Sequence, residues 1–142
     1  MTLTHETLIA HLHTGGVMMA ALVVVNLFVP SRLHWKEEMS RLSLVNRQIF
    51  QVHSVFLVLT LGLFSLLLLT CARALIEPTR LSRAVLIGLT TFWGLRMVMQ
   101  WGFYSSELWR GHRFNTVVHY VFSVIWIYLT GVFAVALWMN VR

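Results

Sequence analysis

Charged residues are scarce in this sequence, and their scarcity indicates whether the protein folds in water or in a lipid bilayer. Only 11% of the 142 residues are charged, whereas 58% are apolar. A soluble domain carries about a quarter charged residues, and a chain this short cannot bury so much apolar surface away from water. The composition therefore excludes an ordinary water-soluble domain and indicates that the chain lies in a lipid bilayer.

Cysteine and the motifs of common enzyme classes are also nearly absent. The single cysteine, Cys71, excludes an internal disulfide and a paired-cysteine metal or redox site. The sequence contains no phosphate-binding loop, zinc-protease motif or nucleophile elbow. The net charge of +6 comes mostly from residues between apolar runs, which favours contact with lipid headgroups over nucleic acid. Whether the protein is an enzyme stays open at this point.

What the chain does have is four long apolar runs without the two-residue alternation of a membrane β-barrel. Each is long enough for a helix, at ~1.5 Å per residue, to cross a ~30 Å hydrocarbon core. Short connections predict antiparallel neighbours. We therefore expect an all-α fold, a single four-helix transmembrane domain over residues 1–142 with up-down-up-down topology. The expected spanning helices cover residues 8–29, 48–76, 81–104 and 114–139.

The longest connection, residues 30–46, has a pattern of its own. Trp35, Met39, Leu42 and Val45 recur at helical spacing, with charged residues on the other faces. This pattern predicts a short amphipathic helix in the membrane interface, and an ordinary polar loop is the alternative.

The expected topology places both termini on one side of the membrane, called side A here. The opposite side, side B, carries six basic residues against four on side A. The excess of positive charge favours side B as cytoplasmic and the termini as non-cytoplasmic. We expect an integral protein of the bacterial inner membrane.

Two stretches share the pattern R-x-x-x-x-V-H-x-V-F. Arg47 precedes His53 and Arg113 precedes His119 by the same spacing. Both histidines are expected ~9 Å below side B, on parallel helices. Ionisable residues at such depth usually face the bundle interior, so the two imidazoles are expected to approach one another.

The two other spanning segments place polar residues in the same half of the membrane. Arg96, Gln100 and Tyr104 follow at four-residue spacing and share one helix face, and Asn26 lies one turn before Pro30. Two glycines on the same segment as Arg96, Gly94 and Gly102, leave room for a flat ring to approach the backbone. The candidate site residues are His53, His119, Arg96, Gln100, Tyr104, Asn26, Arg47 and Arg113.

Paired histidines on parallel helices resemble, in geometry, the haem-binding bundles of b-type cytochromes. The likeness implies that His53 and His119 ligate one haem b, with Arg47 and Arg113 beside its propionates. The residues themselves equally allow a quinone-like pocket, and either version implies electron transfer through a membrane or peripheral protein partner. The alternative is a subunit without chemistry that stabilises or regulates a membrane complex, in which the polar residues hold helices together.

Overall fold

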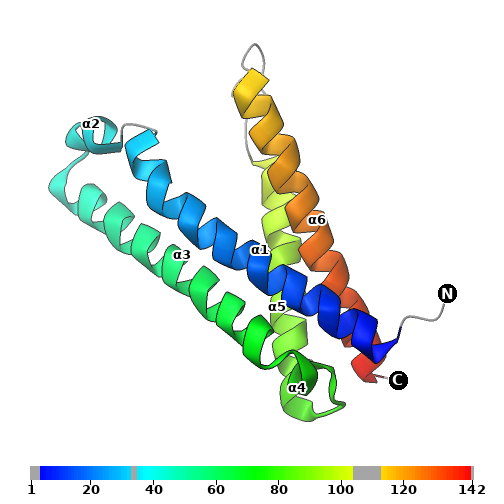
Figure 1. Cartoon of the computed structure of the whole chain (residues 1–142). Coiled ribbons are helices and arrows are strands. Elements are labelled where there is room, and N and C mark those ends of the chain that lie inside the picture. Colours follow the sequence, from blue (N-terminus) through cyan, green and yellow to red (C-terminus); the bar gives the residue numbers. More distant parts are fainter. Residues whose placement is uncertain (1–3, 33–34, 104–112, 142) are drawn as a thin grey trace. The chain divides into compact units, whose positions relative to one another are not determined.

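The computed structural model describes residues 4–32, 35–103 and 113–141 (Figure 1). Every regular element in these ranges is a helix, and four helices are long and apolar enough to cross a membrane. The expected all-α fold of a small polytopic membrane protein is therefore confirmed. The helices are α1 (His5–Arg32), α2 (Trp35–Ser40), α3 (Leu44–Thr70), α4 (Ala72–Ile76), α5 (Arg80–Gly102) and α6 (Arg113–Val141).

Two of the differences from the expected helix boundaries fall at Cys71 and Pro30. The helix expected to continue to Ile76 ends at Thr70, because Cys71 leaves the helical conformation (φ −118°, ψ 16°) and the short helix α4 follows. The residues on both sides of Cys71 are compatible with a helix, so the sequence does not mark this break. Helix α1 also continues two residues past Pro30, where the sequence pattern ends it.

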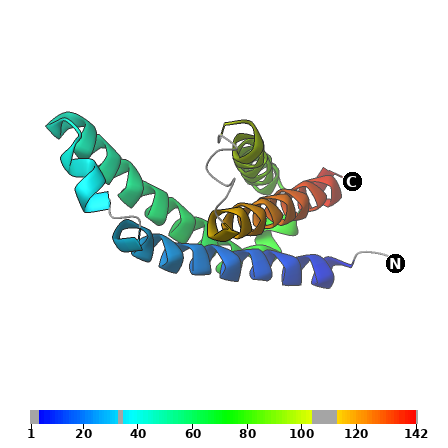
Figure 2. The same ribbon diagram turned by 90° about the horizontal axis from the view of Figure 1, so that it is seen from above.

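The short helix between α1 and α3 is α2, and it carries the expected amphipathic pattern over its six residues. Trp35 is half-buried and its ring meets Phe50 edge-on at 4.8 Å, whereas Lys36, Glu37 and Glu38 are exposed. In Figures 1 and 2, α2 is the cyan turn between the ends of α1 and α3.

The amphipathic pattern is expected to extend through Leu42 and Val45, but the helix does not extend that far. Helix α2 ends at Ser40, and Ser43 starts α3 by accepting a hydrogen bond from the Asn46 backbone N–H. A serine at this position satisfies a backbone donor that has no partner within the helix.

The chain divides into two compact units, one formed by residues 12–72 and the other by residues 1–11 with 73–142. Within the first unit, α1 and α3 approach closely at Gly16. The Ser65 hydroxyl donates to the Gly16 carbonyl oxygen at 2.8 Å, and a Cβ atom at Gly16 would lie 2.8 Å from Leu69 Cγ. Only a residue without a side chain permits this approach, as expected where membrane helices pack through small residues.

In the second unit, α5 and α6 form an antiparallel hairpin with a seven-residue repeat. His119, Trp126, Phe133 and Asn140 are buried on α6 at seven-residue intervals. The buried residues of α5 follow a matching pattern: Ser82, Leu86, Leu89, Trp93 and Gln100. Such spacing is that of a left-handed coiled coil, in which the repeating positions interlock along the seam.

Polar residues close the hairpin seam at the end where α5 begins. Asn140 Nδ2 donates to the Glu77 carbonyl oxygen at 2.6 Å and to Ser82 Oγ at 2.9 Å. Ser82 also belongs to the cap of α5, where Thr79 Oγ1 accepts from the Ser82 backbone N–H and Ser82 Oγ accepts from the Thr79 backbone N–H. The last turn of α6 is therefore hydrogen-bonded to the first turn of α5.

Candidate functional site

A second polar cluster lies at the opposite end of the same seam, and Gln100 is its centre. Gln100 is 5% exposed and His119 is 8% exposed. Gln100 Nε2 donates to His119 Nδ1 at 2.9 Å, which joins α5 to α6. Gln100 Oε1 accepts from Trp126 Nε1 at 3.3 Å and from Arg96 Nη1 at 3.2 Å. One amide thus connects two buried aromatic rings and a guanidinium.

The position of Arg96 explains how a cation is accommodated in an apolar helix. Its guanidinium carbon lies 5.0 Å from the ring centroid of Trp126, and its Nη1 donates to Gln100. An aromatic face attracts a cation, more strongly where water is excluded. Arg96 is half-buried, so Trp126 and Gln100 supply part of the stabilisation that its charge needs there.

The hydrogen bonds of Gln100 define which nitrogen of His119 carries the proton. The amide oxygen must face Arg96 and Trp126, because both of these groups can only donate. The amide N–H₂ then faces His119 Nδ1, which must accept. In a neutral imidazole the proton is therefore on Nε2, which makes Nε2 a hydrogen-bond donor.

Aromatic rings lie beside the polar cluster. The Trp101 ring meets His119 edge-on at 5.2 Å, and Trp126 stacks on Trp93 at 5.0 Å. Ser123, one turn from His119, donates back to the His119 carbonyl oxygen at 2.8 Å. Aromatic side chains of α5 and α6 therefore flank the polar cluster.

His53 differs from His119 in which ring nitrogen carries the proton. It is exposed on α3, and its Nδ1 lies 2.8 Å from the Ile49 carbonyl oxygen. Because a carbonyl only accepts, Nδ1 carries the proton and the lone pair is on Nε2. His53 and His119 belong to different units, and their expected approach to one another stays a prediction.

The remaining candidate residues have varied positions. Asn26 is half-buried and its amide donates to the Leu22 carbonyl oxygen of its own helix at 2.8 Å. Arg47 is half-buried in the first turn of α3, and Arg113 is exposed at the first residue of α6. Tyr104 lies outside the described residues. The structure therefore brings together Arg96, Gln100 and His119, and their role in binding stays a prediction.

Two features of the hairpin unit are not evident in the sequence. In the sequence, Trp126 looks like a packing residue. In the structure, its N–H donates to Gln100 and its ring face contacts Arg96. Tyr128 of α6 lies with its hydroxyl 2.9 Å from His11 Nδ1 near the start of α1. The seven-residue spacing from His119 is the signal that places Trp126 on the same buried face.

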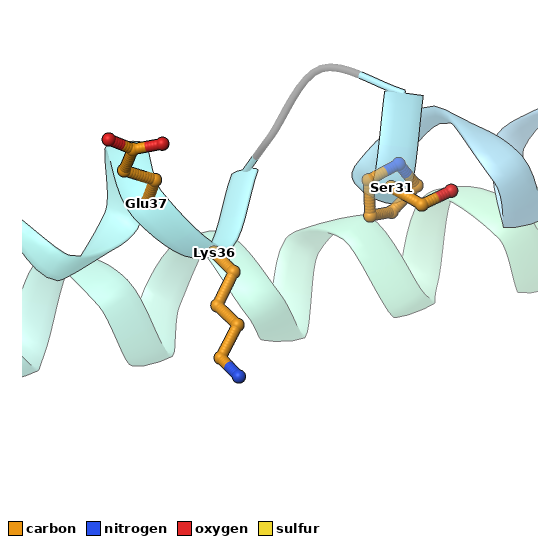
Figure 3. Close-up of a pocket in the computed structure, with 4 residues that line it drawn as sticks. Ser31, Lys36 and Glu37 are labelled. Atoms are coloured by element: carbon orange, nitrogen blue, oxygen red, sulfur yellow. The ribbon is translucent and has the colours of Figure 1, made fainter.

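Over residues 4–32, 35–103 and 113–141, no three His, Cys, Asp or Glu side chains come together as a metal site. A recess of about 410 Å³ lies beside α2 in the other unit, lined by Pro30, Ser31, Lys36 and Glu37. Figure 3 shows the Lys36 and Glu37 side chains pointing away from each other. Opposite charges that diverge in this way do not converge on one ligand.

Comparison with known proteins gives no relative from which a role can be transferred. No family model, no curated protein sequence and no solved structure matches this chain.

Proposed function

We propose that this membrane protein binds a quinone-class headgroup at His119, within a larger membrane complex in which the quinone accepts electrons from a reduced partner subunit. The observation that carries the proposal is the hydrogen bond from Gln100 Nε2 to His119 Nδ1. This bond leaves the His119 proton on Nε2, and we assign the hydrogen bond to a quinone carbonyl oxygen to that atom. A quinone becomes a quinol by taking up two electrons and two protons, and only the binding step is assigned to this site.

The cluster supports hydrogen-bond donation better than metal ligation. To ligate haem iron through Nε2, His119 would need its proton on Nδ1 and an acceptor facing it. The Gln100 amide would then have to turn, and its N–H₂ would face Trp126 Nε1 and Arg96, which are both donors. The haem version of the site therefore requires the loss of two hydrogen bonds, whereas the quinone version keeps all three.

Other candidate residues have defined parts in this proposal. Arg96 fixes the Gln100 amide and adds positive charge beside the headgroup. His53, with its lone pair on Nε2, suits a metal ion or a hydroxyl donor such as a quinol. Asn26, Arg47, Arg113 and Tyr104 stay candidate site residues predicted from the sequence.

Infrared spectroscopy of a decyl-tailed benzoquinone added to the purified protein tests the proposal directly. A hydrogen bond from His119 is expected to lower the frequency of one carbonyl band. The lowered band should be lost in His119→Phe and kept in His13→Phe, the control at an exposed histidine of α1. A carbonyl band that does not move in the wild-type protein, or that still moves in His119→Phe, contradicts the proposal.

Two further measurements on the same preparation separate the quinone from the haem. The ¹⁵N chemical shifts of the His119 ring should show a protonated Nε2 and an unprotonated Nδ1. Protein from haem-replete cells should show no Soret band. A Soret band that disappears in His119→Phe would replace the quinone with a haem.

A structural or regulatory role without chemistry is the second candidate, and one observation favours it. Arg96, Gln100, His119 and Trp126 bond to one another within a single hairpin, as polar side chains do where they hold membrane helices together. In that case His119→Phe would weaken the hairpin and the recovery of co-purifying partner subunits, with no effect on any quinone band.

A further inference from the structure

An open groove lies on the flank of α5, beside the polar cluster. It has a volume of about 530 Å³ and is lined by Met97, Val98, Trp101 and Gly102. The lining is apolar, so the groove suits a hydrocarbon group and offers no charged partner.

One side chain, Trp101, lies between the groove and His119 and contacts both. Trp101 lines the groove and also meets the His119 ring edge-on at 5.2 Å. A ligand whose polar end reaches His119 can therefore extend an apolar end across the Trp101 indole. A membrane contains amphipathic molecules with one polar end and one apolar end, and this arrangement suits such a ligand.

Gly102 keeps the groove open. A Cβ atom at Gly102 would meet nothing within 4 Å, so the space beside its backbone is unfilled. Gly94, the other glycine noted in the sequence, is different, because a Cβ atom there would lie 3.8 Å from Thr130 Cγ2. An added group therefore meets open space at Gly102, and at Gly94 it would come into ordinary van der Waals contact with Thr130.

We infer that this groove, lined by Met97, Val98, Trp101 and Gly102, holds the hydrocarbon tail of the quinone whose headgroup binds at His119. The inference rests on the proposed function and adds the part of the ligand that the polar cluster does not explain. It assigns the headgroup and the tail to separate residues, so the two contributions can be removed separately.

The experiment compares two probes on three proteins in the same detergent. The probes are a dimethoxy-methyl benzoquinone with a decyl tail and the same headgroup without a tail. The proteins are the wild type, Gly102→Leu, which fills the groove, and Gly88→Leu. Gly88 is a matched control because it is an exposed glycine of α5 whose Cβ position also has nothing within 4 Å.

Gly102→Leu is expected to weaken binding of the tailed quinone by about tenfold, the effect of no longer burying about two methylene groups. Binding of the tailless headgroup should be unchanged, and Gly88→Leu should bind both probes as the wild type does. Equal weakening of both probes in Gly102→Leu would place the headgroup in the groove and overturn the inference. So would an unchanged affinity for the tailed quinone, or the same weakening in Gly88→Leu. A wild-type protein that binds neither probe would overturn the proposed function itself.

Discussion

Replacing Gln100 with methionine removes the centre of the polar cluster while keeping the length of the side chain. Two of the lost hydrogen bonds cross from α5 to α6, namely those to His119 Nδ1 and from Trp126 Nε1. Hydrogen bonds between membrane helices average ~0.6 kcal/mol and reach ~1.7 kcal/mol. The loss of both should therefore lower the free energy of unfolding by about 1–3 kcal/mol. The Trp126 and Arg96 donors left beside a thioether place the expected loss toward the upper end of that range.

The assay is reversible unfolding in mixed micelles of a mild detergent and dodecyl sulfate, followed by circular dichroism. Gln51→Met is the matched control, because Gln51 is exposed on α3 and an exposed substitution usually changes stability by less than about 0.5 kcal/mol. Combining Gln100→Met with His119→Phe in a double-mutant cycle isolates the bond between them, with an expected coupling of ~0.6–1.7 kcal/mol. If Gln100→Met unfolds like Gln51→Met, the cluster does not hold the hairpin together.

Three further predictions use the same unfolding assay. Asn140→Leu removes the polar contacts at the other end of the hairpin and should cost about 1–3 kcal/mol, so a stability equal to the wild type would refute their role. Gly16→Val places a side chain where a neighbouring leucine already lies and should lower the free energy of unfolding by about 1–3 kcal/mol. Its control is Gly62→Ala, which has open space at its Cβ and should unfold within about 0.5 kcal/mol of the wild type. Trp126→Phe keeps a ring beneath Arg96 and loses only the indole N–H, so it should destabilise less than Trp126→Leu, and the reverse order would exclude the cation–π contact.

Hydropathy is sufficient to predict the four spanning helices and the short helix between the first two. It does not predict the break at Cys71, because Thr70, Ala72 and Arg73 beside it are all compatible with a helix. Helix boundaries depend on backbone hydrogen bonds, and a run of apolar side chains carries no information about which of those bonds are made.

The candidate site was predictable in part. The four-residue spacing correctly places Arg96 and Gln100 on one face, where they are hydrogen-bonded. The contact between Gln100 and His119 depends on the register between α5 and α6, which no local pattern specifies. The hydrogen bond of Trp126 was not predicted, because a tryptophan within an apolar run looks the same in the sequence whether it donates a hydrogen bond or only packs. Asn26 donates a hydrogen bond to its own helix, and its part in the candidate site stays a prediction.

The α5–α6 seam has polar contacts at both ends and large apolar side chains between them. Sliding one helix past the other by a single heptad would take His119 away from Gln100 and Ser82 away from Asn140. Displacement of α6 along α5 therefore costs the hydrogen bonds at both ends of the hairpin at once. We expect α5 and α6 to keep their register whenever the hairpin moves.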